Sequence, residues 1–466
     1  MENPIREDRD QVFEESLEKI FDLLKEKKYF LARDEILKYN AADIAEMLEE
    51  ISDENGIRMA VILFRLLPKD TSVDVFSYMS TDDQVDIISE ITEKETSSIV
   101  EELDFDDKID ILEELPANIV NRILEKTPKN ERKQINTFLN YPENSAGSLM
   151  TPEFVSLKKD WTVVEALEHI RDVGMEAETV YTLYVRDNSY KLIGIVSLSK
   201  LVVSSKDTRM GDIMKTDFVY ETVTTDQEEV SEDFKKYDLI AIPVVDKEQR
   251  LVGIITVDDI LDVIEDEATE DIERMAGVID MNKTDKKYLD ISVWKHTLNR
   301  LPWLVILMIA YIFTGLLVKS FDAKLEEMII LVTYMPLVMG TSGNTGSQSA
   351  TLVIRGFSTG DLETDDWYRI LWKEVRVGVL VGLILGGFNF LRIYFLDREP
   401  WTLALTVSLA MGIIVILSKV VGSMIPVLVR KMKQDPALIA NPLMDCISDA
   451  LALSVYFLLA LKLLHL

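Results

Sequence analysis

Residues 301–318 read LPWLVILMIAYIFTGLLV and carry no charged side chain. A helix needs about 20 mainly apolar residues to cross the hydrocarbon core of a bilayer. Four further mainly apolar stretches follow, at 328–354, 377–391, 401–417 and 436–460. Arg392 and Lys419 limit two of them, but long basic side chains can extend toward the membrane surface. We therefore predict a membrane domain of five helices over 293–466.

Basic residues lie mainly on one side of the predicted spans. The second and third spans are joined by a segment with Arg355, Arg369, Lys373 and Arg376, and the fourth and fifth by one with Arg430, Lys431 and Lys433. The positive-inside rule then places residues 1–292 in the cytoplasm and the C-terminus outside. We expect a multi-pass protein of the cell membrane.

Charge divides the chain into two unlike halves. Of its 50 Lys and Arg and 81 Asp and Glu, residues 293–466 hold 15 and 13, which leaves 35 bases and 68 acids for residues 1–292. Such an acidic half argues against a nucleic-acid partner, because phosphate binding needs a basic face. The single cysteine, Cys446, excludes an internal disulfide framework, and the three histidines lie too far apart in sequence to suggest a metal site.

Repeats organise the acidic half. Residues 10–140 predict successive helices, because apolar residues recur at spacings of three and four. Within them, DDQVDII at 82–88 matches DDKIDIL at 106–112, which indicates stacked helical hairpins. In the next part, LMTPEFV at 149–155 matches IMKTDFV at 213–219, and LIGIVSLSKLV at 192–202 matches LVGIITVDDIL at 251–261. Each copy predicts a short strand, a helix, two further strands and a helix.

This duplication resembles a tandem pair of cystathionine-β-synthase-type (CBS) domains, which often act as regulatory modules. Such pairs commonly bind adenine nucleotides, but no residue set in 148–265 specifies a nucleotide.

Two acids fall inside the fifth predicted span. Asp445 and Asp449 are four residues apart and so share one helix face. A bare carboxylate at bilayer depth costs roughly 2.5–3.5 kcal/mol on insertion scales. We expect a cation site on a permeation path, and the alternative is a pair with Lys419 or a position at the membrane edge. Oxygen ligands without a histidine or thiol cluster favour a hard ion such as Mg²⁺ or Ca²⁺.

The second predicted span is unusually polar. Residues 334–351 read YMPLVMGTSGNTGSQSAT, and glycines at three positions would weaken a helix there. Polar or broken backbone in a bilayer is tolerated only against protein or a cavity, whereas small residues also permit close packing of helices. A cavity-lining segment and a packing face are therefore both open. Asn441-Pro442, within DPALIANPLMDCISD at 435–449, predicts a second break.

An acidic run precedes the membrane domain. DDILDVIEDEATEDIE at 258–273 has nine acids and no base. In a helix, like charges four residues apart cost about 0.2–0.5 kcal/mol per pair. We interpret the run as part of a divalent-cation sensor, and the alternative is a solvated linker helix.

Together, GTSGNTGSQSAT at 340–351 and DPALIANPL…D at 435–449 resemble the MgtE family of magnesium channels, and the resemblance covers nearly the whole chain. It implies a multidomain fold whose membrane part is a homodimer in lipid with the ion path between the two copies. The implied parts are an all-α helical-repeat N-domain (1–140), two α/β CBS domains (148–208 and 209–265), an acidic connecting helix (266–292) and an all-α transmembrane pore domain of five helices (293–466).

The resemblance also implies residue roles. Asp449 takes the position of the family's pore aspartate, which binds hydrated Mg²⁺; Asn441 lines the same site, and Asp435 lies near its cytoplasmic mouth. Asn344 ends a motif that is GGN in the family and Ser342-Gly343-Asn344 here. Asp445 departs from the family, which usually has a small neutral residue at this position, so a dimer would hold four carboxylates near its axis. The implied Mg²⁺-sensing acids are Asp106, Asp110, Glu228, Asp238, Asp259, Asp262, Glu267, Glu270 and Asp271.

The predicted function is a Mg²⁺-gated channel for magnesium uptake and not an enzyme. Cytoplasmic Mg²⁺ would screen the sensor acids and favour a compact, closed form. Two alternatives are open. One is an exchanger that couples Mg²⁺ to Na⁺ or H⁺ through Lys419 and Asp445, and the other is a non-conducting divalent sensor.

Overall fold

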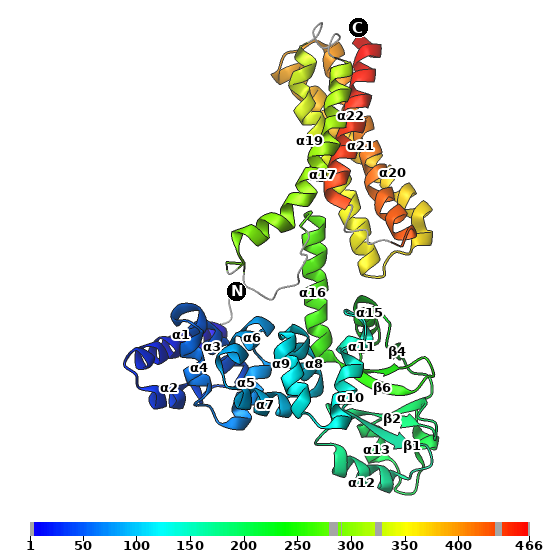
Figure 1. The fold of residues 1–466 in the computed structure, drawn as a ribbon. Coiled ribbons are helices and arrows are strands. Elements are labelled where there is room, and N and C mark those ends of the chain that lie inside the picture. The colour runs from blue at the N-terminus through cyan, green and yellow to red at the C-terminus, as the bar shows by residue number, and fades with distance from the viewer. Residues whose placement is uncertain (1–3, 279–287, 290, 322–328, 434–439, 465–466) are drawn as a thin grey trace. The chain divides into compact units, whose positions relative to one another are not determined.

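The computed structural model describes residues 4–278, 288–289, 291–321, 329–433 and 440–464, and only the backbone at 4–11, 55 and 440–443. The chain forms two compact units, one built from residues up to Ile264 and one from residues after it (Figure 1). We describe each unit by itself.

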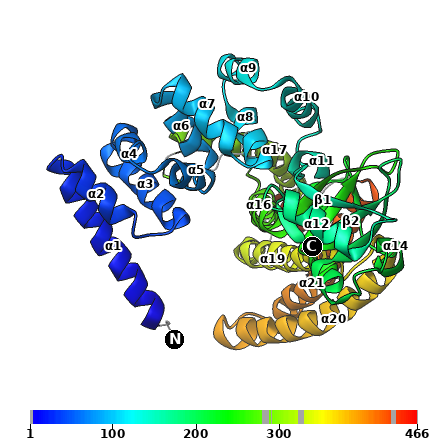
Figure 2. The ribbon, with the colours of Figure 1, turned by 90° about the horizontal axis from the view of Figure 1, so that it is seen from below.

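The first unit begins with the predicted run of helices (Figure 2). Asn40, Ser80 and Thr92 each accept a hydrogen bond from a backbone N–H of the helix that they precede, which fixes where these helices begin. The repeated motifs lie on α6 and α8, which pack together with Ile87 and Ile111 fully buried. The helices are α1 (Pro4–Lys25), α2 (Tyr29–Ile36), α3 (Ala41–Asn55), α4 (Ile57–Phe64), α5 (Lys69–Ser77), α6 (Thr81–Glu90), α7 (Glu93–Glu102), α8 (Phe105–Glu114), α9 (Ala117–Lys126) and α10 (Lys129–Phe138).

The predicted duplication follows, with two three-stranded sheets. In each sheet the first strand runs parallel to the second, and the second runs antiparallel to the third. The first copy contains α11 (Ala146–Leu149), β1 (Phe154–Lys158), α12 (Val163–Val173), β2 (Thr179–Arg186), β3 (Leu192–Ser197) and α13 (Leu198–Val203). The second contains α14 (Met210–Ile213), β4 (Glu221–Thr222), α15 (Gln227–Tyr237), β5 (Ala241–Val245) and β6 (Leu251–Thr256).

The matching motifs explain how the two copies join. A Cβ at Gly194 would lie 2.8 Å from Met214 Sδ, and a Cβ at Gly253 would lie 2.6 Å from Met150 Sδ. Each glycine therefore makes room for the methionine of the other copy. This reciprocal contact accounts for the joint recurrence of the two motifs.

Helix α16 (Val257–Met275) carries the acidic run. It begins before the predicted connecting segment 266–292 and ends inside it. Ile260 and Val263 are buried in the first unit, whereas Met275 packs against Ala350 and Met444 in the second.

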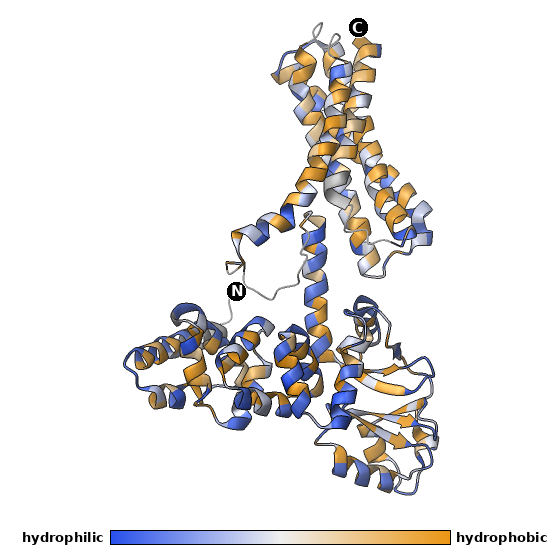
Figure 3. Cartoon of the chain, in the orientation of Figure 1, coloured by the Kyte–Doolittle hydropathy of each residue, from blue (hydrophilic) through white to orange (hydrophobic). Residues whose placement is uncertain are grey.

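The second unit contains five long helices in the part of the chain that the structure describes. They are α17 (Val293–Ser320), α19 (Ile330–Ser358), α20 (Trp367–Leu391), α21 (Trp401–Lys431) and α22 (Ala440–Leu464), with a 3-10 turn at Thr364–Asp366 and a π-helical turn at Arg392–Leu396. Four of the described helices are long and apolar enough to cross a membrane; α19 has the length but is too polar to meet the same criterion. The apolar character of these helices is visible in Figure 3.

The predicted break in the second span is wrong. α19 is one continuous helix from Ile330 to Ser358. Gly346 serves close packing instead, because a Cβ at Gly422 of α21 would overlap the carbonyl oxygen of Gly346. At the second expected break, Asn441 and Pro442 lie in the first described turn of α22, where proline is tolerated, and residues 434–439 lie outside the described residues.

Candidate functional site

The second unit places Asp445 and Asp449 one turn apart on α22, as predicted. Asp449 is only 8% exposed. Ser347 Oγ donates a hydrogen bond to Asp445 Oδ1 at 3.1 Å, and a Cβ at Gly343 would lie 2.9 Å from the same oxygen. The Asp445 carboxylate therefore rests directly against α19 at Gly343, where a larger residue would have to displace it.

A second polar contact holds the same two helices. Ser342 Oγ donates to the carbonyl oxygen of Ser448 at 2.9 Å and lies 2.7 Å from Ser418 Oγ of α21. The backbone that immediately precedes Asp449 is thus tied to α19, and through it to α21. Buried hydroxyls that satisfy one another in this way fix the relative position of packed helices.

Lys419 has a partner other than the one we considered from sequence. Its Nζ lies 3.6 Å from Glu374 Oε2 of α20, and it donates to Ser349 Oγ at 3.2 Å. Ser349 in turn donates to Glu374 Oε2 at 2.7 Å. Within the described residues no ion pair joins Lys419 to Asp449, so the pairing that we offered as an alternative is not found. Sequence reasoning missed Glu374, because it stands among the bases that precede the third span.

The other predicted pore residues are less informative. Asn344 follows Gly343 on α19, and its side chain is exposed. Asp435 and the side chain of Asn441 lie outside the described residues.

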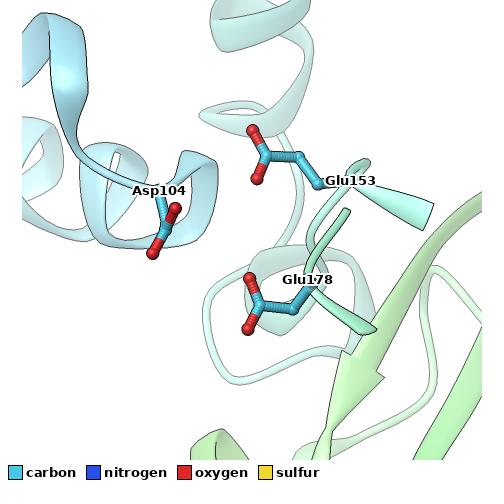
Figure 4. Close-up of side chains that lie close together, drawn as sticks. All are labelled: Asp104, Glu153 and Glu178. Carbon is cyan, nitrogen blue, oxygen red and sulfur yellow. The ribbon is translucent and has the colours of Figure 1, made fainter. Parts of the chain in front are cut away.

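The first unit brings together three acids that the sequence analysis did not select. Oxygens of Asp104, Glu153 and Glu178 all lie within 4.8 Å of one another (Figure 4). Asp104 immediately precedes α8, whereas Glu153 and Glu178 immediately precede the parallel neighbours β1 and β2. The backbone N–H of Glu178 donates to the carbonyl oxygen of Glu153 at 2.8 Å, which fixes the two strand starts side by side. Their position before adjacent parallel strands was the available signal.

The three acids lie in a strongly acidic field. Burial, followed by repulsion from Asp104 and Asp106, raises the pKa of Glu153 to about 7. Burial and the charges of α8 and of the start of α16 likewise raise the pKa of Glu178 to about 7. Lys108 only partly offsets this field for Glu153, and it is itself paired with Glu131 at 3.0 Å.

Three of the predicted sensor acids belong to the same field. Burial, together with repulsion from neighbouring carboxylates, raises the pKa of Asp106, and it raises the pKa values of Asp110 and Asp259 to about 7. Asp107, which we did not select, has its pKa raised to about 8 for the same reasons. These acids repel one another when they are ionised, which is why they retain protons near neutral pH. A divalent cation bound among them would displace the protons and offset the repulsion.

The remaining predicted sensor acids are not grouped with these. Glu228 lies in the first turn of α15, and Asp238 directly follows that helix. Asp262 is exposed on α16, and Glu270 pairs with Arg274 one turn further along. Glu267 and Asp271 lie on the part of α16 that belongs to the second unit. Within the described residues, Asp104, Glu153 and Glu178 form the one group of three that could share an ion.

Comparisons with known proteins match three parts of the chain. Residues 335–459 match a family model described as a divalent cation transporter (MgtE), residues 39–144 match the MgtE intracellular N domain, and residues 146–206 and 210–266 match the CBS domain.

Whole relatives are also similar. The magnesium transporter MgtE of Thermus thermophilus is 41% identical over 334 residues, which cover 72% of this chain and 73% of that protein. The magnesium transporter MgtE of Bacillus subtilis is 32% identical over 336 residues, with the same two coverages. A crystal structure of the cytosolic domain of the Mg²⁺ channel MgtE in complex with ATP is 34% identical and covers 53% of this chain and 99% of that one, at a TM-score of 0.49.

Proposed function

This chain belongs to the MgtE family of magnesium transporters, and we propose that it is a Mg²⁺-gated channel that mediates magnesium uptake. Family membership confirms the expectations of a multi-pass membrane transporter and of a protein that is not an enzyme. Gating, channel-type transport and the residues involved are our proposal.

The observation that carries the proposal is the pair of acids on α22. Two carboxylates one turn apart repel each other unless a cation lies near them. Among the described residues no base pairs with Asp445 or Asp449, and the buried base Lys419 is already paired with Glu374. A divalent cation offsets this charge, and carboxylate oxygens are the ligands that Mg²⁺ prefers.

The pore itself would form between two copies. Only 6% of the most apolar stretch of α17 is buried within the chain, so most of its surface is available to lipid or to a second copy. In a homodimer, Asp445 and Asp449 would contribute four carboxylates near the axis. We place residues 1–292 in the cytoplasm from the distribution of basic residues between the spans.

Gating would depend on the acids of the first unit. Mg²⁺ bound by Asp104, Glu153 and Glu178 would offset the repulsion among these acids and those of α8 and α16. When Mg²⁺ falls, repulsion favours a more open arrangement. For this to work, Mg²⁺ must bind the closed state more tightly than the open state. Binding of an adenine nucleotide by the CBS pair is consistent with the CBS family match, and this mechanism does not depend on it.

The proposal is tested by Mg²⁺ flux into liposomes that contain the full chain. We expect Asp449→Ala to lower the flux by roughly tenfold or more, because an interaction with a charged ligand is worth about 1.5–3 kcal/mol. Asp365→Ala, which removes an exposed acid before α20, is the matched control and should retain wild-type flux. Wild-type flux in Asp449→Ala would refute the pore assignment, and flux that requires a Na⁺ or pH gradient would establish the exchanger instead.

A further inference from the structure

The exposed side of α20 and α21 contains an open groove of about 390 Å³. Its lining comes from Val379 to Phe390 on α20 and from Leu405 to Ile416 on α21, and it is apolar apart from Ser408. Leu383, in the middle of the groove, is 69% exposed. In a membrane such a surface must be covered by lipid or by protein.

Glycines create the groove. A Cβ at Gly382 would lie 2.7 Å from the carbonyl oxygen of Gly412, and one at Gly386 would lie 3.0 Å from that of Ser408. The two helices therefore approach closely along small residues, as membrane helices commonly do. Gly387 faces away from this contact, and a Cβ there would meet no atom within 4 Å. The floor of the groove is thus backbone, with open space above it.

One end of the groove is basic. Arg376 is exposed and lies three residues before Val379, so that it shares the helix face that lines the groove. Its guanidinium lies over the ring of Trp372, 5.8 Å from the centroid, and its Nε donates to the carbonyl oxygen of Trp372 at 3.3 Å. Lys373 is exposed beside it. Tryptophan beside basic residues is typical of the membrane–water interface.

The length of the groove fits one leaflet. Val379 and Phe390 are eleven residues apart, which at a rise of 1.5 Å per residue gives about 17 Å. This is roughly half of the ~30 Å hydrocarbon core. An acyl chain whose headgroup lies at Arg376 would therefore follow the groove to about the middle of the bilayer.

We propose that this groove binds an anionic phospholipid, with one acyl chain along α20 and α21 and its phosphate on Arg376 and Lys373. The charge of the basic end selects an anionic headgroup, and the apolar lining accepts the chain. With residues 1–292 in the cytoplasm, the lipid comes from the cytoplasmic leaflet. The inference does not depend on how the protein transports Mg²⁺.

Native mass spectrometry of the purified full chain with phosphatidylglycerol and phosphatidylcholine tests the charged end. We expect the wild type to retain phosphatidylglycerol preferentially. The variant Arg376→Gln with Lys373→Gln should lose that preference, by about fivefold for each basic residue. Both side chains are exposed, so this variant should fold normally. An unchanged preference for phosphatidylglycerol would overturn the proposal.

Filling the groove tests the acyl chain. Gly387→Phe places a ring in open space above the groove floor and should abolish the retained lipid, whereas Gly315→Phe on α17, whose Cβ also meets no atom within 4 Å, should retain it. Thermal unfolding of both variants verifies that they are folded. Equal lipid retention in the two variants would overturn the proposal, and so would a change from dimer to monomer in Gly387→Phe without loss of lipid, because a second copy would then cover the groove.

Discussion

Lys419 of α21 lies 3.6 Å from Glu374 of α20, Nζ to Oε2, with the two side chains only 7% and 12% exposed. Ser349 of α19 accepts a hydrogen bond from Lys419 and donates one to Glu374, so three helices meet at this ion pair. In such buried surroundings, either charge would be strongly destabilising without the other. This contact uses the base that could otherwise have neutralised an acid of α22.

Removing one member of this pair should be costly. We expect Lys419→Met, or Glu374→Gln, to lower the free energy of unfolding by about 3–5 kcal/mol, because either change leaves an uncompensated buried charge. The double variant should recover most of the loss. Unfolding of the purified protein in detergent measures this, and single variants as stable as the wild type would contradict it.

Stability of the first unit should depend on pH when divalent cations are absent. The pKa of Asp107 is about 8, and those of Asp110 and Glu153 are about 7, against about 4 in an unfolded chain. Between these limits the folded state binds more protons, so stability falls as pH rises from about 4 to about 8. The full loss of stability is present above pH 8, where these acids are ionised in both states, and it is absent below pH 4. Thermal unfolding in chelator at several pH values tests the sign.

Mg²⁺ should reverse that loss where the acids are ionised. Because the ion displaces protons from carboxyls, its stabilising effect should be larger at pH 8 than at pH 5. The increase in melting temperature on adding Mg²⁺, measured at both pH values, tests this. An equal increase at both would mean that the raised pKa values do not belong to the cation site.

Close packing of α19 and α21 should be sensitive to a single methyl group. We expect Gly422→Ala to destabilise the protein by about 1–3 kcal/mol, because its Cβ would overlap the backbone of Gly346. Gly340→Ala on α19 is the control, since its Cβ meets no atom within 4 Å. That variant should be as stable as the wild type or slightly more stable. Equal stability of the two variants would contradict the packing described here.

Asp445 should affect ion binding through its charge and its position. Asp445→Asn removes the charge, and Ser347→Ala removes the hydrogen bond that orients the carboxylate. We expect both to raise the Mg²⁺ concentration for half-maximal flux, Asp445→Asn by roughly tenfold and Ser347→Ala by less, since hydrogen bonds to charged groups are worth about 1.5–3 kcal/mol. Unchanged half-maximal concentrations in both would exclude Asp445 from the ion path.

Local patterns were enough to predict most of the architecture. The helical repeats, the duplicated strands and the long apolar helices follow from periodicity and motif matches within short stretches. The prediction failed at α19, where Gly346, one of the glycines that suggested a break, packs against Gly422 within a continuous helix. Helix propensity alone does not predict which residues from another part of the chain will pack against a helix.

The ion pair of the second unit and the acid cluster of the first unit both depend on tertiary contacts. Glu374 reaches Lys419 only because α20 and α21 pack closely along glycines. Glu153 and Glu178 meet only because β1 and β2 are parallel neighbours, and Asp104 reaches them from the start of α8. Spacing in the sequence specifies neither contact.

The most direct test of Mg²⁺ gating is flux in liposomes with Mg²⁺ varied on the side of the cytoplasmic domain. We would compare the wild type with a variant that combines Asp104→Asn, Glu153→Gln and Glu178→Gln, and with a control that replaces the exposed Glu101, Glu125 and Glu168 by Gln. We expect rising Mg²⁺ to close the wild type and the control at the same concentration, and to leave the cluster variant unaffected. Closure of all three proteins at one Mg²⁺ concentration would contradict a sensor built on Asp104, Glu153 and Glu178.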